Sequence, residues 1–413
     1  MKRQAVITGL GIVSPIGVGV ENFWAAACAG LSGISTPTLF DASKLPRECQ
    51  IVGEVKNFNV RDWMPGAAGK MAGRFSQFAV AAAKMARDDS GLDDSDIPGD
   101  RILVSIGTSV SGLADVQLPF FAAYVRGDVL SPWAVLESPG HAAASHVSIS
   151  SGGRGQTTAF ATACVAGLDA VTWAAEKVCA GEATAAIAGG TESPISESSL
   201  EAFRVLGALS RWIGPPSEAS RPFDRLRSGL VLAEGAAVVI VEDEANARAR
   251  GARIYARILG SASVSEGSHM REVDNRGDGA ARAMRMVLQR AGLSVRDIDY
   301  ICAHGNSLPD YDAAETAGIK AAFGSQASCL AVSSIKSMCG QALAASGAMQ
   351  IITACLALRD NIIPPTINYE VPDPACDLDY VPNTSRKARV EHVLVHAQSI
   401  GGSHSALVLG KGD

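Results

Sequence analysis

Cys164 has the surroundings of a catalytic nucleophile. It lies in the run ATACVAGLDAV, where a strand-like segment gives way to an Ala-rich helical segment. A thiol at the start of a helix meets unpaired backbone amides and the positive end of the helix dipole, and both favour the thiolate. The competing interpretation is packing, because cysteine is often a small buried hydrophobe. Cys164 is therefore the first candidate for thiol chemistry.

His304 is the second candidate. It follows the apolar run IDYICA, in the segment AHGNSLPDYDAAE. Loops at strand ends often carry reactive groups, and histidine is the usual acid or base near neutral pH. A structural histidine is an equal alternative. Glu315 follows in the same segment, at a predicted helix start.

Lys336 stands in the apolar, glycine-rich segment AVSSIKSMCGQALAASG. Lysine is rarely buried without a partner, so the segment predicts a carboxylate beside it, and Glu315 is the candidate. Farther along, HAQSIGGSHSALVLG places Gly401 and Gly402 between two apolar strands. Backbone N–H groups in such a turn can approach a reacting carbonyl, but a simple hairpin explains the segment equally well.

The elements that must position these residues alternate between short apolar strands and Ala-rich helices, which predicts an α/β protein. Strands are expected at AVITGLGIV, ILVSIGTSV, TAAIAGGTE and AAVVIVED, buried on both faces because polar residues do not alternate. A second series follows, comprising ARILGSASV, the helix AMRMVLQRAGL, IDYICAHG, AVSSIKSMCG, HVLVHAQSIGG and ALVLG. The two series predict similar halves, residues 1–250 and 251–413.

Composition excludes several classes of protein. The 413 residues are 47% hydrophobic and 19% charged, which favours a large core, and a net charge of −6 offers no broad basic surface to nucleic acid. No apolar run reaches the roughly 18 residues needed to cross a bilayer, so a soluble intracellular protein is expected. The nine cysteines form no CxxC pair, which argues against zinc sites and disulfide frameworks, and all but Cys164 are expected to be reduced and buried.

Motifs for other cofactors and nucleophiles are missing from the sequence. TGLGIVS begins like a dinucleotide fingerprint but has Ser14 where the third glycine belongs. Neither a GxxxxGK[ST] phosphate loop nor a GxSxG hydrolase elbow occurs. Thiol chemistry without a cofactor is the reading that survives.

Together the segments resemble the β-ketoacyl synthase I and II family along nearly the whole chain. The matching segments, in the family's order, are VITGLGIVSPIG, ATACVAG, GGTESP, SRPFDRLRSGLVLAEGAAVVIVED, AHG, SSIKSMCG and LRDNIIPPTIN. The resemblance implies a duplicated five-layer αβαβα thiolase fold, with the nucleophilic Cys in residues 1–250 and the His, Lys and Gln in residues 251–413. It also implies a β-ketoacyl-acyl carrier protein synthase, an acyltransferase of fatty-acid or type II polyketide synthesis.

The resemblance assigns a role to each candidate. Cys164 carries the acyl chain as a thioester, His304 acts on the malonyl unit during its decarboxylation, and Lys336 and Glu315 hold the site together electrostatically. The oxyanion hole is expected from the backbone amides of Cys164 and Ile400, beside the Gly401–Gly402 turn. No bound cofactor or metal is implied, because phosphopantetheine on acyl carrier protein carries the substrates. A cytoplasmic homodimer, or a heterodimer with a related ketosynthase-like subunit, is expected, with no nucleic-acid or membrane partner.

The chain departs from the family at several positions round the site. Gln341 stands where the family has a second catalytic His; an amide cannot shuttle a proton near neutral pH, but its N–H₂ can donate to the malonyl thioester oxygen. Asn306 and Leu308 replace threonines that contact pantetheine, and Ile400 replaces the Phe that gates the acyl pocket. The family's NSFGFGGTN reads HAQSIGGSH, which predicts a bulkier, stiffer or more polar acyl chain.

Carrier docking and the exact reaction stay open at this point. The family's basic docking stretch reads PGAAGK, which leaves mainly Lys70 and Arg74, and the dimer partner is expected to shape the acyl pocket near Val110. One alternative is a non-elongating partner, either a chain-length-factor-like subunit or an acyltransferase that uses Cys164 without decarboxylation. Another is a thiolase, but GGSHSALVLG lacks the second reactive cysteine that thiolases need.

Overall fold

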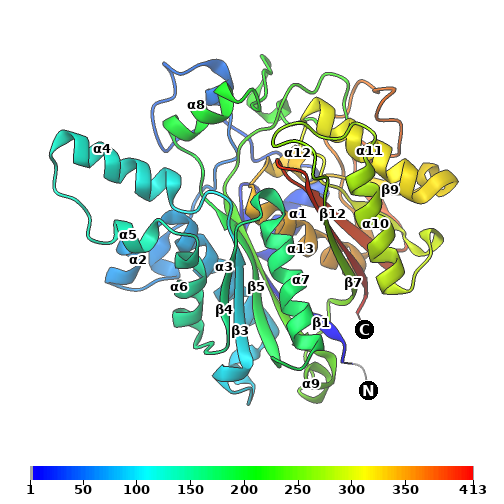
Figure 1. Ribbon diagram of the computed structural model, residues 1–413, viewed down its shortest axis with the longest axis horizontal. Coiled ribbons are helices and arrows are strands. Elements are labelled where there is room, and N and C mark those ends of the chain that lie inside the picture. The colour runs from blue at the N-terminus through cyan, green and yellow to red at the C-terminus, as the bar shows by residue number, and fades with distance from the viewer. Residues whose placement is uncertain (1–2, 413) are drawn as a thin grey trace.

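Within residues 3–412, which the computed structural model describes, eleven strands form one mixed sheet (Figure 1). Its path of hydrogen-bonded neighbours is β4-β3-β5-β6-β1-β7-β13-β12-β8-β9, and β2 pairs beside it with β1. The strands are β1 (Ala5–Ser14), β2 (Gly17–Val18), β3 (Ile102–Gly107), β4 (Thr157–Phe160), β5 (Ala185–Glu192), β6 (Gly235–Asp243), β7 (Ala256–Ser265), β8 (Tyr300–Cys302), β9 (Ala331–Ser333), β12 (His392–Gln398) and β13 (Ser403–Lys411). Two short strands, β10 (Ile362–Ile363) and β11 (Arg386–Lys387), pair separately.

The two halves of the sheet have the same topology. When the five path strands of each half are numbered along the chain, both halves show the spatial order 3-2-4-5-1. In both halves the second strand runs parallel to the third and fourth, and the fifth runs antiparallel to the fourth and first. The halves join where β1 pairs with β7. The duplication predicted from the sequence is therefore present in the strand order.

Helices complete five layers. The helices are α1 (Val20–Ala29), α2 (Ala67–Met71), α3 (Arg74–Ser90), α4 (Leu118–Arg126), α5 (Ala134–Glu137), α6 (His141–Ser151), α7 (Ala166–Cys179), α8 (Glu197–Val205), α9 (Glu244–Ala249), α10 (Asp278–Ala291), α11 (Pro309–Phe323), α12 (Lys336–Cys339) and α13 (Ala344–Asp360). α7 and α13 contact each other and strands of both halves of the sheet. They therefore lie between the two halves, which form the two β layers, and make the central layer. α3 and α6 cover the outer face of the first half, and α10, with α11 packed beside it, covers that of the second. This αβαβα arrangement confirms the predicted thiolase-type fold.

The first strand shows why the layers pack so closely. Every residue of β1 is buried, as expected for a strand covered on both faces. A Cβ at Gly9 or Gly11 would lie 2.1 Å from the Ala86 carbonyl oxygen or 1.9 Å from that of Ala82, both in α3. Glycine at these two positions therefore lets the backbone of α3 approach the strand.

Most predicted elements are present, and the exceptions have simple causes. Each apolar run named above contains a strand, and AMRMVLQRAGL lies in α10. β4 was missed because it is a partly exposed edge strand without an apolar run. Cys179 and Cys329 are exposed and Cys28 is half-buried, which corrects the expectation that all of the other cysteines are buried. Within residues 3–412, no helix combines the length and hydropathy that crossing a bilayer requires.

Candidate active site

Two helix starts in the central layer bring the candidate residues together. A Cβ at Gly167, in the first turn of α7, would lie 2.3 Å from the carbonyl oxygen of Ala344, the first residue of α13. Gly190 on β5 is equally close, with 2.5 Å to the same oxygen. The absence of side chains at these glycines lets the two helix starts meet. Cys164, just before α7, and Gln341, just before α13, therefore lie in the same region.

Cys164 is a buried thiol on a strained turn. It sits in a short 3-10 turn, Ala163–Val165, and the preceding Ala163 has a φ of 52°, which a non-glycine residue adopts at a cost. Burial raises the pKa of the Cys164 thiol to about 11, although interaction with the Gln341 side chain and the Lys336 charge acts to lower it. The thiolate expected from the helix start is therefore outweighed by burial. At rest Cys164 is therefore a thiol.

His304 follows β8 and is a neutral imidazole with a defined tautomer. Its Nδ1 accepts a hydrogen bond from the Gln398 backbone N–H at 3.3 Å, so its proton resides on Nε2. Burial, followed by the positive charge of Lys336, holds the pKa of His304 well below its usual range. His304 thus offers a hydrogen-bond donor from Nε2 rather than a cationic acid.

Lys336 does not pair directly with Glu315, and the prediction of that ion pair was wrong. Its Nζ donates to the His304 carbonyl oxygen at 2.6 Å and to Gln350 Oε1 at 3.2 Å. Burial lowers the pKa of Lys336 to about 8, and the negative charge of Glu315 offsets part of that effect. The ammonium is therefore held by two neutral oxygens, with the carboxylate acting from farther away.

Glu315 is occupied by other donors, which explains the missing ion pair. Its carboxylate accepts the backbone N–H groups of His304 and Gly305, at 2.7 and 2.8 Å. Its Oε1 also lies 2.5 Å from His396 Nδ1. Burial acts to raise the pKa of Glu315, but these hydrogen bonds hold it below its usual range. Glu315 is an anionic clamp on the loop that carries His304.

Gln341 has an unpaired donor. Its backbone is fixed between Val231 and Ala233, with N–H to Val231 oxygen at 2.8 Å and Ala233 N–H to its own oxygen at 2.9 Å. Its Oε1 accepts from the Ser346 hydroxyl at 3.2 Å. Among the described residues no acceptor meets its buried Nε2 in hydrogen-bond geometry, although the amide lies close enough to the Cys164 sulfur to lower the pKa of that thiol. A buried donor without a partner costs stability, so it is available to an incoming oxygen.

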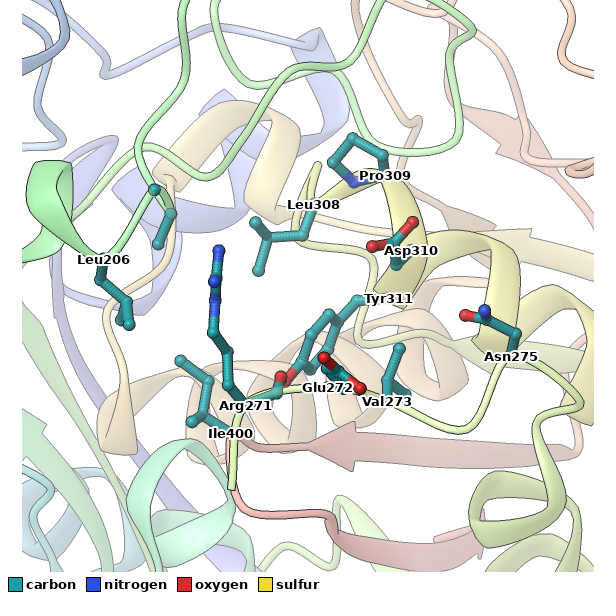
Figure 2. A pocket seen from close by; sticks show the side chains of 12 residues that line it. Leu206, Arg271, Glu272, Val273, Asn275, Leu308, Pro309, Asp310, Tyr311 and Ile400 are labelled. Atoms are coloured by element: carbon teal, nitrogen blue, oxygen red, sulfur yellow. The ribbon is translucent and has the colours of Figure 1, made fainter. Parts of the chain in front are cut away.

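A cavity of about 410 Å³ lies at the turn between β12 and β13 (Figure 2). Ile400 occupies that turn, and Gly401 and Gly402 follow it with φ values of 92° and 77°, which favour glycine. Leu308, Arg271 and Ile400 are among the side chains that line the cavity in Figure 2. The hairpin interpretation of this segment is correct, and the turn lies beside a cavity as well.

The three residues predicted to contact substrate differ in their surroundings. Leu308 lines the cavity. Leu308 and Val110 both pack on the apolar cluster that contains Cys164. Asn306 is buried, and its Oδ1 accepts the Leu308 backbone N–H at 3.1 Å. The Asn306 side chain thus shapes its own loop, whereas Leu308 and Val110 lie near Cys164.

Of the two basic residues expected at a docking surface, only Lys70 is exposed. The Arg74 guanidinium donates to Glu234 from Nε at 2.8 Å and from Nη2 at 2.6 Å. Glu234 is fully buried and needs a counter-charge, so Arg74 serves inside the protein. This corrects the expectation that Arg74 helps docking.

Sequence reasoning missed four polar residues round the site: Glu192, Gln350, His396 and His404. Glu192 is fully buried and accepts the backbone N–H groups of Ser109, Val110 and Ser111. His396 and His404 are polar residues within the apolar strands β12 and β13, a signal that would have marked them as partners of another buried group. Among residues 3–412 no cluster of His, Cys, Asp and Glu could hold a metal ion.

Comparisons with known proteins agree along the whole chain. The family model "Beta-ketoacyl synthase, N-terminal domain" matches residues 2–247, and "Beta-ketoacyl synthase, C-terminal domain" matches residues 255–370. A 3-oxoacyl-[acyl-carrier-protein] synthase 2 of Coxiella burnetii is 39% identical over 411 residues, 99% of each chain. A putative polyketide beta-ketoacyl synthase 1 of Streptomyces cyaneus is 38% identical over 429 residues, covering 99% of this chain and 98% of that protein.

Solved structures show the same similarity. One is a type II polyketide synthase acyl-carrier protein in complex with its ketosynthase bound to the hexaketide, with a TM-score of 0.91 and 34% identity over all of both chains. Another is the ishigamide ketosynthase/chain length factor, with a TM-score of 0.92 and 31% identity over all of both chains. Both similarities extend over every layer described above.

Proposed function

Because this chain belongs to the β-ketoacyl synthase family, we propose that it elongates a carrier-bound acyl chain by decarboxylative condensation with malonyl-acyl carrier protein. The enzyme is an acyltransferase of fatty-acid or type II polyketide synthesis. The observation that carries the proposal is the convergence of a thiol, a neutral imidazole and a side-chain amide: Gln341 and Lys336 both act on the buried Cys164 thiol, and Lys336 also contacts His304. Such a site suits thioester chemistry from which water is excluded.

In the first step, Cys164 takes the acyl chain from acyl carrier protein. Its sulfur attacks the thioester carbonyl, and the new Cys164 thioester forms as the bond to the pantetheine sulfur breaks. The proton of the buried Cys164 thiol passes to the departing pantetheine thiolate, so the exchange needs no net acid or base. The backbone amides of Cys164 and Ile400 are proposed to hold the oxyanion, and one such donor is typically worth about 10²–10³ in rate.

In the second step, a malonyl unit loses CO₂ beside His304 and Gln341. The Nε2–H of His304 and the amide N–H of Gln341 would donate to the malonyl thioester oxygen and stabilise the enolate that forms. The enolate carbon then attacks the Cys164 thioester carbonyl, and the thiolate leaves. One proton must reach Cys164 afterwards, because its raised pKa makes the thiol the resting form. Gln341 serves in this scheme as a donor only.

The proposed partners are acyl carrier protein and a second ketosynthase-like subunit. Exposed apolar side chains gather on the segment round α4 and α5, which stands away from the body in Figure 1: Phe121, Tyr124, Val125, Val129 and Val135. β4 ends the sheet path as a half-exposed edge strand. A bare edge strand and an apolar surface are features that a partner subunit would cover. A reducing compartment such as the cytoplasm suits a catalytic thiol.

The test is mass spectrometry of the carrier protein after incubation with acyl-carrier protein, malonyl-carrier protein and the enzyme. The expected product is a β-ketoacyl chain extended by one malonyl-derived unit, absent with Cys164→Ala. If the enzyme instead gains an acyl mass on Cys164 and never extends it, elongation by this chain alone is wrong. Gln341 in place of the second His favours that alternative, a transferase or a subunit that requires a partner.

A further inference from the structure

A chain of four buried side chains runs from the active site to a second surface cavity. Glu315 Oε1 and His396 Nδ1 are 2.5 Å apart, His396 Nε2 and His404 Nδ1 are 3.4 Å apart, and His404 Nε2 and Glu266 Oε1 are 2.8 Å apart. None of the four side chains is more than 3% exposed. The condensation steps proposed above give His396, His404 and Glu266 no role.

Counting protons shows that this chain carries one more than its neutral rings supply. Its three contacts each need a proton, because two carboxylates and two imidazoles meet only through oxygen and nitrogen atoms. Two neutral imidazoles provide one N–H each. A third proton must therefore reside within the chain, on a ring or on a carboxyl group. Without it, one contact would bring two lone pairs together between buried anions.

The surroundings favour His396 as the site of this extra proton. The first turn of α10 packs against His404, since a Cβ at Gly279 would lie 2.5 Å from His404 Nε2. The positive end of that helix opposes a cation there. Burial and the charge of His396 lower the pKa of His404 to about 4. Protonated His396 can donate to Glu315 on one side and to His404 on the other, and His404 can then donate to Glu266.

Other charged groups face the chain from both ends. On the inner side, Lys336 and the ring of His304 lie close enough to interact electrostatically with it. The negative charges of Cys164 and Glu266 likewise act to raise the pKa of Tyr311 in α11. On the outer side, Glu266 Oε2 accepts the Asp274 backbone N–H at 3.0 Å and the Ser268 hydroxyl at 3.3 Å.

The outer end opens toward solvent. Glu266 lines a cavity of about 320 Å³ together with Ser268, His269, Glu272, Asp274, Arg276, Asp278 and Arg282. Glu272, Asp274, Arg276, Asp278 and Arg282 are charged residues of α10 or of the loop before it, and Arg276 and Arg282 pair with Asp274 and Asp278. Protons can therefore enter or leave the chain at Glu266, which lines this cavity and not the one beside Ile400.

We propose that Glu266, His404, His396 and Glu315 form a one-proton chain that positions His304 for decarboxylation. Glu315 holds the backbone of His304 and Gly305, so whatever fixes the Glu315 carboxylate fixes the donor ring as well. The proposal rests on the proposed role of His304. His396, His404 and Glu266 are positioning residues, and loss of the shared proton as pH rises is expected to release Glu315 and slow the malonyl step.

The proton itself is tested by ¹⁵N NMR of the wild-type protein labelled at histidine, between pH 5.5 and 9. The expected result at pH 7 is one ring with both nitrogens protonated, whose signals disappear in His396→Asn. Finding both the His396 and the His404 ring in neutral tautomers at pH 6 would overturn the proposal. This measurement needs no substrate, so its outcome is independent of the proposed function.

The positioning role is tested by separating the two half-reactions. His396→Asn is expected to slow malonyl-carrier decarboxylation about tenfold, the loss of one charge-assisted hydrogen bond, and to remove the alkaline fall of that rate. Acylation of Cys164 should stay unchanged, whereas a merely structural defect would slow both steps. Glu266→Gln, at the outer end of the chain of side chains, should shift the pH at which the decarboxylation rate falls on the alkaline side.

The matched control is His392→Asn, on the same strand. His392 lies outside the chain, with Nδ1 2.9 Å from the Asp297 carbonyl oxygen, and its substitution should leave both half-reactions and the pH profile unchanged. Equal profiles for wild type, His396→Asn and His392→Asn would contradict the positioning role. If His396→Asn fails to fold, Glu266→Gln and the wild-type NMR titration still decide the question.

Discussion

The two halves of the sheet share one topology but hold their active loops with different carboxylates. In each half the loop after the second strand is clamped through its backbone amides. Glu192, at the end of β5, accepts the N–H groups of residues 109–111, which follow β3. Glu315, from α11, accepts those of His304 and Gly305, which follow β8. The same structural need is met from a strand in one half and from a helix in the other.

The clamps differ in the charge beside them. Burial raises the pKa of Glu192 to about 7. Its hydrogen-bond partners are neutral amides and hydroxyls, which act to lower this pKa but do not outweigh burial. Burial acts on Glu315 as well, but the neighbouring His396 and the amides keep its pKa below the usual range. Of these two carboxylates, the one that faces a histidine is the one whose pKa stays below the usual range. The proposed nucleophile, Cys164, lies in the half with the titratable clamp, and the proposed decarboxylating groups lie in the half with the fixed one.

The largest effect on condensation is expected from substituting the proposed catalytic residue of either half, Cys164 or His304. Cys164→Ala should lower condensation by at least about 10⁴-fold, because no acyl thioester can form. It should still decarboxylate malonyl-carrier protein, since His304 and Gln341 are untouched. His304→Ala should do the reverse, forming the acyl-enzyme without releasing CO₂. Mass spectrometry and CO₂ release distinguish the two.

Cys329→Ala is the control for the nucleophile, because this cysteine is exposed and lies in the other half. It should condense at the wild-type rate. A Cys164→Ala protein that still extends the acyl chain would place the nucleophile elsewhere and remove the division of labour between the halves.

The second effect tests the clamps through stability. A carboxyl whose folded pKa is raised stabilises the native state below its unfolded pKa, and that contribution is lost as the pH climbs through the folded value. For Glu192, a rise from 4.5 to about 7 corresponds to roughly 3 kcal/mol, lost between those pH values. Glu192→Gln should abolish this loss. Urea unfolding at several pH values measures it.

Glu315→Gln should show the opposite slope. Its folded pKa is lowered, so its contribution is present above the unfolded pKa and is lost as the pH falls through the folded one. The variant should therefore lose the most stability at neutral pH and little in acid. Parallel pH profiles for the two Gln variants would contradict the difference between the clamps.

The third effect concerns Gln341, in the second half. Gln341→Ala removes the unpaired donor and should slow decarboxylation about 10²-fold, the usual worth of one such group, while Cys164 is acylated normally. Ser346→Ala removes only the hydroxyl that orients the amide, so its effect should be smaller, about threefold to tenfold. Equal rates for Gln341→Ala and wild type would show that the amide is not a donor to substrate.

The sequence was most informative where chemistry and pattern coincide. Unbroken apolar runs revealed the buried strands, and short motifs identified Cys164, His304 and Lys336. The Lys336–Glu315 pair was predicted wrongly, because spacing does not show that backbone amides already occupy the carboxylate. The histidine chain was missed because its bonded partners lie 81 and 138 residues apart along the chain. Such contacts exist only once both strands and both flanking helices are in place.

The smallest expected effect concerns the segments that connect the fourth and fifth strands, which differ between the two halves. Between the fourth and fifth strands the first half makes a long excursion, residues 193–234, whereas the second half makes only the turn at residues 399–402 that carries Ile400. Ile400 lines the cavity with Leu308 and Arg271, and we predict that its volume limits the acyl chain that can pass. Ile400→Phe should lower kcat/KM for branched or aromatic acyl-carrier substrates by about tenfold relative to a short straight chain, a typical cost of added bulk in an apolar pocket. Competition between the two substrates measures the ratio directly. An unchanged ratio would mean that the long excursion of the first half, and not the turn of the second, selects the acyl chain.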